Sequence, residues 1–253
     1  MRPLAETEAA WVPEYFGDDY LRLYQFPAER TDPEVAFLRD VLTDAVPGGR
    51  VLDLGCGQGR HAVPLAQAGF RVTGLDFQAN LLRAARARAH DAAVALSLVR
   101  GDMRRLPFAG AFDAVLCIFT AFGYFADVEN ARVLHEVARA LRPGGWFVLD
   151  VANRDALIRH AQAASDKTLP DGTQVTATWT WDVAAGRYTH RQWLRGTDGR
   201  ETALAHSVRV YTCTELTMLL EAAGFRVVQR HGGFRGEALT LDAPRLITIA
   251  QRA

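Results

Sequence analysis

Residues 51–61 read VLDLGCGQGRH, and this stretch decides the fold of the chain. An apolar run that contains Asp53 leads directly into three alternating glycines, Gly55, Gly57 and Gly59. Glycine adopts positive φ angles without strain and lets a ligand approach the backbone closely. A glycine-rich turn between a strand and a helix is therefore typical of a nucleotide site, and the identity of that nucleotide decides the chemistry.

Strand and helix patterns alternate on the C-terminal side of this turn. Strands are predicted at residues 50–54, 70–76, 93–102, 112–120 and 146–153, and the helical patterns between them include 80–90 and 130–141. The stretch FDAVLCIFT at 112–120 is almost continuously apolar, which is typical of a strand buried on both faces. This alternation predicts an α/β fold with a doubly wound parallel sheet, whose ligands bind beyond the carboxyl ends of the strands.

The pattern changes after residue 165. Residues 172–212 are rich in Thr, Val, Trp and Tyr and contain Gly-bearing turns, which favours an antiparallel meander. A helix at 214–224 and strands at 225–231 and 245–251 then resume the first pattern. We therefore predict an N-terminal helical cap or lid at 1–49, a core at 50–164 and 212–253, and an antiparallel β insertion at 165–211. The insertion either covers the substrate or forms the contact of a homodimer, because exposed strand edges and aromatic faces invite pairing.

The composition disfavours several classes of protein. The 253 residues are 49% hydrophobic, and 29 basic residues balance 29 acidic ones, so the chain lacks the positive field of a dedicated nucleic-acid binder. The cysteines, Cys56, Cys117 and Cys213, lie far apart without a CxxC pair, which disfavours a disulfide framework and a zinc site. No clustered His, Asp and Glu set suggests a catalytic metal. Without a signal peptide or a stretch long enough to span a membrane, the expected protein is cytoplasmic and has no membrane partner.

The glycine spacing distinguishes between kinds of nucleotide. A dinucleotide fingerprint requires a third glycine where Arg60 stands, and Gly59 comes one place early. The Gly-Lys-Ser/Thr ending of a triphosphate loop is also absent. Read as D-x-G-x-G-x-G, Asp53, Gly55, Gly57 and Gly59 instead resemble the first motif of class I S-adenosylmethionine-dependent methyltransferases. The alternative for such a motif standing alone is a tight turn without a ligand.

An acid follows the second predicted strand. Asp76 ends the stretch GLD, and Phe77 comes directly after it. The resemblance implies that Asp76 accepts hydrogen bonds from both ribose hydroxyls and that Phe77 contacts the cofactor. A carboxylate suits two neighbouring donors because it has two acceptor oxygens. Dinucleotide enzymes also place an acid here, so Asp76 alone does not decide between the two classes.

The third and fourth strands end in further residues that match the family. Gly101, Asp102 and Met103 resemble the adenine site, although Asp102 as the N-cap of a helix is the alternative. The resemblance places Ile118 and Phe119, at the end of the fourth strand, beside the methyl donor. LRPGGWFVLD resembles the family's turn before the fifth strand, so motifs in family order cover residues 50–153.

Over its whole length the chain is most similar to bacterial small-molecule methyltransferases with a β-strand insertion after the fifth strand. DYLRLY, GRH, FGYF and VRVYT carry this likeness. It implies a seven-stranded Rossmann-like sheet, S-adenosylmethionine as cofactor and S-adenosylhomocysteine as product. It also implies a small-molecule amine, hydroxyl or carboxyl acceptor, and a cofactor or substrate contact from Tyr20, whose alternative is a helix packed on the sheet edge. Arg60 is a further candidate for the cofactor, at the methionine carboxylate, and its alternatives are the acceptor and the start of the helix.

Candidate substrate contacts come from outside the glycine turn. Tyr124, in FGYF, lies just beyond the fourth strand, and its alternative is a wall residue without a chemical role. Arg209 and Tyr211 share one face of the predicted strand VRVYT by the two-residue period, and His190 lies in the same meander. Packing against tryptophans of the meander is the alternative for Arg209 and Tyr211, and a structural or solvated histidine is the alternative for His190.

The chemistry itself predicts no catalytic signature. Methyl transfer from a sulfonium is an in-line displacement, in which the protein mainly aligns the nucleophile, the methyl carbon and the sulfur. A general base is needed only where the acceptor keeps its proton near neutral pH. We therefore assign no catalytic residue from the sequence.

Other functions remain as alternatives. An RNA methyltransferase is disfavoured by zero net charge and by the absence of N/D-P-P-Y/F after the fourth strand, and Cys117 lacks the Pro-Cys context of cytosine-C5 enzymes and is predicted to be a buried structural cysteine. A protein methyltransferase and a non-catalytic S-adenosylmethionine-binding protein stay open. Arg60 in the place of a glycine argues against a dinucleotide oxidoreductase.

Overall fold

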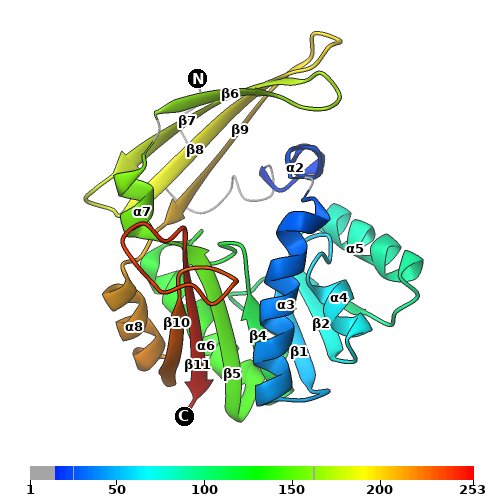
Figure 1. The fold of residues 1–253 in the computed structure, drawn as a ribbon, viewed down its shortest axis with the longest axis vertical. Coiled ribbons are helices and arrows are strands. Elements are labelled where there is room, and N and C mark those ends of the chain that lie inside the picture. Colours follow the sequence, from blue (N-terminus) through cyan, green and yellow to red (C-terminus); the bar gives the residue numbers. More distant parts are fainter. Residues whose placement is uncertain (1–14, 25, 162) are drawn as a thin grey trace.

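The computed structural model describes residues 15–24, 26–161 and 163–253. Its centre is a seven-stranded sheet in the order β10-β11-β5-β4-β1-β2-β3 (Figure 1). The strands are β1 (Arg50–Leu54), β2 (Arg71–Asp76), β3 (Ser97–Arg100), β4 (Phe112–Cys117), β5 (Leu141–Ala152), β10 (Phe225–His231) and β11 (Arg245–Arg252). β1 to β5 pair in parallel, as the alternating pattern predicts. The doubly wound α/β fold with an antiparallel insertion is confirmed.

The last strand departs from the predicted parallel sheet. β11 is antiparallel both to β10 and to β5, so the sheet is mixed. Parallel neighbours need a long crossover connection, usually a helix. The loop between β10 and β11 contains no helix, and the chain returns along the sheet in the opposite direction.

Helices cover both faces of the sheet and create two apolar layers. They are α3 (Ala28–Ala45), α4 (Ala62–Gln67), α5 (Ala79–Asp91), α6 (Asp127–Ala140) and α8 (Cys213–Ala222). Alternate residues of β4 face the two layers: Val115 packs with side chains of α6 and α8, and Leu116 packs with side chains of α3 and α4. All residues of β4 are buried, which confirms a strand covered on both faces.

A second sheet lies over the carboxyl ends of the parallel strands (Figure 1). It consists of β6 (Ala164–Thr168), β7 (Gln174–Asp182), β8 (Arg187–Arg195) and β9 (Glu201–Arg209), which pair as an antiparallel meander. Helix α7 (Arg154–Arg159) leads into it from β5. No helix among the residues that the structure describes is long and apolar enough to cross a membrane.

Helix α2 (Asp18–Leu23) lies between the two sheets (Figure 1). Leu23 and the preceding Tyr15 pack against Val175, Leu194 and Leu204 of the insertion in a small apolar cluster. This cluster fixes the segment before α3 against the second sheet and places its aromatic rings above the glycine turn. Of the segment predicted as a lid, residues 1–14 lie outside the described part of the chain.

Candidate cofactor and acceptor site

The glycine turn connects β1 to α4. Gly55, Gly57 and Gly59 all have positive φ angles, at 75°, 54° and 75°. A Cβ atom at Gly55 would come 2.9 Å from Ala121, whereas one at Gly57 would meet nothing within 4 Å. Gly55 and Gly57 line a cavity, but Gly59 is not among the lining residues, and a Cβ there would press on Ala85 of α5. Gly59 therefore serves the packing of α5 against the turn.

Asp76 at the end of β2 shapes the turn from beneath. One carboxylate oxygen accepts the Gly57 N–H at 2.9 Å and the other accepts the Gln78 N–H at 2.8 Å. A carboxylate has about four acceptor sites, so the backbone N–H groups of Gly57, Gln78 and Phe77 leave it capacity for a further donor. Burial raises the pKa of Asp76, and the backbone hydrogen bonds oppose that rise. Asp76 and the exposed Phe77 both line the cavity.

Asp53 is buried beneath the same turn. Burial, as the largest effect, raises the pKa of its carboxyl group to about 6, while His61 and Arg60 act in the opposite direction. Its Oδ2 atom has no hydrogen-bond partner among the described residues. A buried carboxylate without a full set of donors is costly, and a cationic ligand group would relieve that cost.

Arg60 and His61 converge on one acid that sequence reasoning missed. Glu34 of α3 accepts a hydrogen bond from Arg60 and contacts His61 Nε2 at 2.7 Å. Burial would raise the pKa of Glu34, but His61 and Arg60 outweigh it and lower that pKa. Glu34 lies four residues before the buried Leu38, on the apolar face of α3. An acid on the apolar face of a helix is the sequence feature that could have identified Glu34 as a buried, paired residue.

The Arg60 side chain is buried where it borders the cavity. Its guanidinium lies over the rings of Phe26, at 4.5 Å, and Phe119, at 5.0 Å. The Nη2 atom has no hydrogen-bond partner in the described residues. A carboxylate is the natural partner for such an atom because a charged acceptor makes the stronger hydrogen bond.

Asp102 follows β3 and is held by Arg104. Both oxygens of Asp102 accept from the Arg104 guanidinium, Oδ1 at 3.1 Å and Oδ2 at 2.8 Å, and Oδ1 also accepts the Arg104 N–H at 2.8 Å. Burial would raise the pKa of Asp102, but the Arg104 hydrogen bonds lower it below its usual range. Asp102 therefore begins a turn, not a helix. Arg104 also contacts Glu129 at 2.5 Å and lies over the Phe125 ring at 4.4 Å.

The chain makes a strained turn where β4 ends. Phe119 and Thr120 are non-glycine residues with φ angles of 62° and 57°. The carboxylate of the fully buried Asp150 accepts the Phe119 N–H at 2.7 Å and two hydrogen bonds from Arg245, both at 2.7 Å. Thr120 donates its N–H to the Asp150 carbonyl oxygen at 3.0 Å. This network fixes Phe119 and its neighbour Ile118 at the cavity wall.

The insertion contributes a roof of rings. His190 of β8 stacks on Trp179 of β7 with ring centroids 4.9 Å apart, and it meets His206 of β9 edge to face at 5.2 Å. Tyr124 approaches His206 at 6.2 Å from the core side. Burial lowers the pKa of His190 to about 4 and that of His206 to about 3, so both imidazoles are neutral at pH 7.

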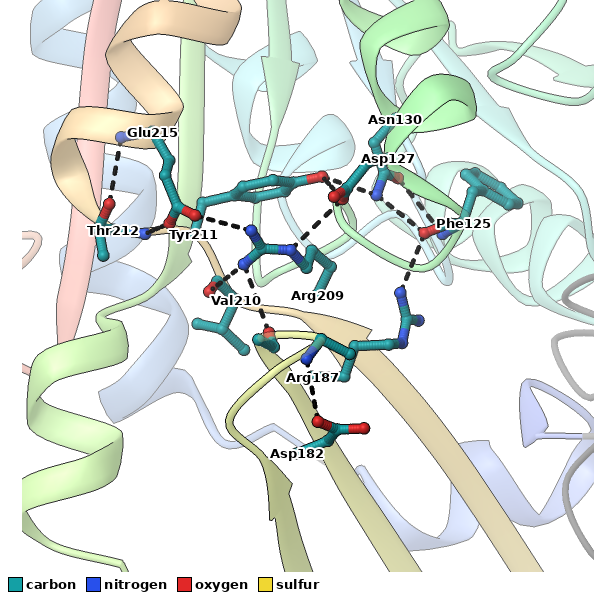
Figure 2. A network of polar contacts seen from close by, with 12 residues as sticks. Phe125, Asp127, Asn130, Asp182, Arg187, Arg209, Val210, Tyr211, Thr212 and Glu215 are labelled. Carbon is teal, nitrogen blue, oxygen red and sulfur yellow. Dashed lines mark hydrogen bonds and ion pairs between the residues drawn. The ribbon is translucent and has the colours of Figure 1, made fainter. Parts of the chain in front are cut away.

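Arg209 and Tyr211 do not lie in this roof, contrary to their assignment as substrate contacts. β9 ends at Arg209, and both side chains point toward α6 and α8 (Figure 2). Arg209 pairs with Glu215 at 2.8 Å, and the Tyr211 hydroxyl donates to Asp127 at 2.8 Å. Neither residue lines the cavity. The two-residue period identified a shared face but could not show that acids of two helices occupy it.

The glycine turn, the residues after β2, β3 and β4, the N-terminal rings and the insertion line one cavity of about 940 Å³, which is near the upper end of the range of about 300–1,000 Å³ for ligand pockets. Of the candidate residues, it brings together Tyr20, Asp53, Gly55, Gly57, Arg60, Asp76, Phe77, Gly101, Asp102, Met103, Ile118, Phe119, Tyr124 and His190. Lining residues that were not assigned individually include Tyr15, Phe16, Tyr24, Phe26, Arg104, Glu129, Tyr188, His206 and Arg245. Tyr15, Phe16, Tyr24 and Phe26 belong to the ring-rich N-terminal segment, and Tyr188 and His206 belong to the insertion. The charged residues come together only through pairing between distant segments.

Burial also determines the protonation state of two cysteine thiols near the site. Cys117 is buried, as predicted, and burial raises the pKa of the Cys117 and Cys56 thiols, so both stay protonated at pH 7. Within the described ranges, no group of three or more His, Cys, Asp or Glu residues is placed to hold a metal ion.

The chain is similar to known methyltransferases. Residues 51–145 match a family model described as a methyltransferase domain. The cypemycin N-terminal methyltransferase of a Streptomyces species is 28% identical over 95% of this chain and 98% of its own length. The solved structure of the CcbJ methyltransferase from Streptomyces caelestis, 22% identical, has a TM-score of 0.80 and covers 94% of this chain and 98% of its own.

The amino pentose methyltransferase CalS10 from Micromonospora echinaspora, solved with bound S-adenosylmethionine, is 25% identical, with a TM-score of 0.67 over 91% of this chain and 98% of its own. Residues 51–145 therefore form a methyltransferase domain, and the sheet has the fold of the solved methyltransferase structures. Together with the glycine turn and the cavity, these likenesses support a class I enzyme that uses S-adenosylmethionine.

The residues at the glycine turn fit this methyl donor. An amino-acid tail carries an ammonium and a carboxylate. The buried Asp53 Oδ2 and Arg60 Nη2 atoms, which lack partners among the described residues, have the complementary charges and belong to lining residues. The open side of Gly57 leaves room for a ligand above the turn. The donor set therefore suits a zwitterionic tail better than a pyrophosphate.

The raised pKa of Asp53 predicts a pH-dependent difference in stability. A pKa of about 6, against 3.8 for an unperturbed Asp, means that this carboxyl stabilises the folded chain below pH 3.8 and that the contribution is lost as pH rises through 6. The difference corresponds to about 3 kcal/mol. Without ligand, wild type should therefore lose about 2 kcal/mol more free energy of unfolding than the Asp53→Asn variant between pH 4 and pH 8. Urea unfolding at several pH values measures this, and parallel pH curves would show that Asp53 ionises normally.

Proposed function

We propose that this enzyme transfers the methyl group of S-adenosylmethionine to an amine nitrogen of a small molecule bound beneath the insertion sheet. One observation carries the proposal: a single cavity is lined both by the glycine turn with Asp76 and by Tyr188, His190 and His206 of the insertion. The donor and the acceptor can therefore meet inside one cavity. We call the part around Asp76 and Asp102 the cofactor end, and the part formed by Tyr15, Phe16, Tyr124, Tyr188, His190 and His206 the acceptor end.

At the cofactor end, the polar groups suit the parts of the methyl donor. Asp76 can accept the ribose hydroxyls with its remaining lone pairs, and Asp102 can accept from the adenine amine beside the Met103 N–H. Asp53 and Arg60 can hold the ammonium and the carboxylate of the tail. When bound, S-adenosylmethionine supplies an electrophilic methyl group on a sulfonium.

The acceptor end consists of rings without a fixed charge. Its two histidines are neutral at pH 7, and burial raises the pKa of Tyr124 well above its ordinary value, so that hydroxyl also stays neutral. A protonated amine would lose its hydration here without gaining a carboxylate, which lowers its pKa and frees the nitrogen lone pair. The nucleophile is then available at neutral pH.

Aromatic faces also suit the charge that this reaction moves. The positive charge passes from sulfur to nitrogen during the transfer, and ring faces attract a cation at short range. Phe16 packs on Tyr15 at 5.0 Å and on Tyr124 at 5.4 Å, which forms a continuous wall. The chain contributes alignment of the two reactants and exclusion of water, and these account for most of the acceleration expected of such an enzyme.

The names of similar proteins favour nitrogen over oxygen. The relative from Streptomyces is named for an N-terminus, and CalS10 is an amino pentose methyltransferase. For this chain an amine is the acceptor that both these names and the uncharged aromatic end support.

Helix α2 is proposed to close the cavity as a lid. Arg22 donates to Asp171 at 2.8 Å and to Thr173 at 2.9 Å in the insertion. Asn80 of α5 donates to Asp18 at 3.1 Å. These contacts connect the lid helix to both the insertion and the core, and they keep Tyr20 over the cofactor end.

Methyl-labelled S-adenosylmethionine tests the proposed function. Matched panels of small amines, alcohols and carboxylic acids are incubated with the enzyme, together with peptides and RNA, and mass spectrometry finds the labelled product. We expect label on a small-molecule amine, with one S-adenosylhomocysteine per methyl group. Label confined to alcohols, carboxylic acids, peptides or RNA would contradict the amine assignment, and tight S-adenosylmethionine binding without any labelled product would favour a non-catalytic role.

His190 provides a prediction for the acceptor end. The His190→Phe variant keeps a flat ring on Trp179 but removes both ring nitrogens, so the KM of the amine should rise about tenfold, as expected for one lost hydrogen bond. The dissociation constant of S-adenosylmethionine should stay within a factor of two. Trp193→Phe, on the outer face of the same strand, is the matched control. An unchanged amine KM in His190→Phe would place the acceptor elsewhere.

A further inference from the structure

We propose that Arg187 is a positioning residue, which holds the backbone of Tyr124 and Phe125 so that both ends of the cavity stay aligned for methyl transfer. The inference rests on the proposed function, because it concerns the same acceptor end. Arg187 lies at the start of β8, outside the cavity, and neither the fold nor the likeness to other methyltransferases assigns it a role.

The Arg187 guanidinium spreads its donors over two segments. Nη1 donates to the Phe125 carbonyl oxygen at 3.1 Å, and Nη2 donates to the Tyr124 carbonyl oxygen at 3.3 Å (Figure 2 shows the contact with Phe125). Nη2 and Nε also donate to the carbonyl and hydroxyl oxygens of Ser207 in β9, at 2.9 and 3.0 Å. One planar group thus fixes two consecutive peptide units of the core loop against the insertion.

The charge of Arg187 is not used in an ion pair. Its hydrogen bonds all end on neutral oxygens, and no carboxylate of the described chain lies within ion-pair distance of its guanidinium. Burial lowers the pKa of Arg187. A half-buried cation that contacts no carboxylate is a costly way to connect two elements, although Asp127 opposes part of the effect of burial on its pKa. Arg187 instead provides a rigid, planar guanidinium with several N–H donors, which a lysine ammonium does not offer.

The held segment connects the two ends of the cavity. The Tyr124 ring packs on Phe16 and faces His206 at the acceptor end. The Phe125 ring supports the Arg104 guanidinium, which holds Asp102 at the cofactor end. A rotation of the peptide between Tyr124 and Phe125 therefore moves the walls of both ends.

The two ends should respond differently to the loss of Arg187. The Phe125 carbonyl oxygen also accepts from Asn130 Nδ2 at 2.9 Å, and the Phe125 N–H donates to Asn130 Oδ1 at 3.3 Å. Since Asn130 is fully buried in α6, this second hold persists in an Arg187 variant. We therefore expect the acceptor end to change more than the cofactor end.

Fluorine NMR tests the position of Tyr124 without any acceptor. 3-Fluorotyrosine is placed at residue 124 in wild type, in Arg187→Met and in the control Arg191→Met. The Arg191 guanidinium donates to Thr180, within the insertion, at 3.4 Å. With S-adenosylhomocysteine bound, wild type and Arg191→Met should give the same single narrow line. Arg187→Met should give a shifted or broadened line. The spectra are recorded well below the unfolding temperature of this variant, so the change reports on the folded protein. A line identical to that of wild type would overturn the proposal.

Kinetics and chemical rescue separate positioning from a general loss of structure. On an amine found by the methyl-label screen, Arg187→Met should lower kcat about tenfold to a hundredfold, because small misplacements of reacting groups have effects of this size. The dissociation constant of S-adenosylmethionine should change less than threefold.

Millimolar guanidinium should restore part of the kcat and the narrow fluorine line in Arg187→Ala, and the kcat of Arg187→Lys should fall between those of Arg187→Met and wild type. A parallel loss of kcat and cofactor affinity without rescue would contradict positioning. If the screen finds no amine, the proposed function fails, while the fluorine line still decides the role of Arg187.

Discussion

The Asp76→Ala variant is expected to bind S-adenosylmethionine more than a hundredfold more weakly than wild type. Asp76 has two tasks, because its carboxylate holds the Gly57 and Gln78 N–H groups and also faces the cavity where the ribose is proposed to lie. Loss of hydrogen bonds to a charged acceptor costs about 1.5–3 kcal/mol each. Two lost ribose contacts together with a loosened turn therefore give about 3–5 kcal/mol. Titration calorimetry with S-adenosylmethionine and S-adenosylhomocysteine measures the change.

Two further variants control this result. Asp76→Asn keeps one acceptor oxygen and should bind S-adenosylmethionine only about tenfold more weakly than wild type. This is a loss of about 1.4 kcal/mol, about half of the lower bound expected for Asp76→Ala. Asp91→Ala, at the exposed end of α5, should bind like wild type. Equal affinities of wild type and Asp76→Ala would show that the ribose does not contact this carboxylate.

The Asp150→Ala variant is expected to lose about 3–5 kcal/mol of folding free energy, since removal of one partner of a buried ion pair leaves the other charge uncompensated. Asp150 is fully buried and accepts from Arg245 and from the Phe119 N–H. Without it, the positive φ angles of Phe119 and Thr120 lose their main support. Urea unfolding at pH 7 measures the loss, and calorimetry should show weaker cofactor binding as the turn relaxes.

The double variant Asp150→Leu with Arg245→Met separates charge from turn geometry. It removes both charges and should recover much of the stability, because apolar replacements of buried pairs are often neutral or stabilising. It should not recover cofactor affinity, since the Phe119 N–H still lacks its acceptor. Asp155→Ala, whose partly exposed carboxylate is 3.9 Å from Arg154, is a control that should stay within about 0.5 kcal/mol of wild type. A loss below 1 kcal/mol in Asp150→Ala would mean that the buried pair contributes little.

The arrangement of the cofactor end could be predicted because it follows from local rules. Asp53, Asp76 and Asp102 each stand in or directly after a parallel strand, and such strands meet their ligands at one edge of the sheet. The glycine turn required no knowledge of distant contacts, since positive φ angles restrict the residue type locally. Hence the lining of this end of the cavity contains most of the residues expected from the sequence.

The remaining parts of the site depend on pairing between distant segments. Glu34 precedes its partner Arg60 by 26 residues, and nothing near either residue indicates the other. The face shared by Arg209 and Tyr211 was predicted, but the acids Asp127 and Glu215 that occupy that side belong to different helices. The direction of β11 was also hidden, because sequence periodicity identifies a strand without its orientation.

A crystal structure with bound S-adenosylhomocysteine would test the central claim most directly. We predict that its ribose lies on Asp76, that its tail lies between Asp53 and Arg60, and that its sulfur faces the acceptor end formed by Tyr124, His190 and their neighbouring rings. The methyl group of the cofactor would then point at the space beneath the insertion. A sulfur directed away from that space, or a ribose out of reach of Asp76, would contradict the account.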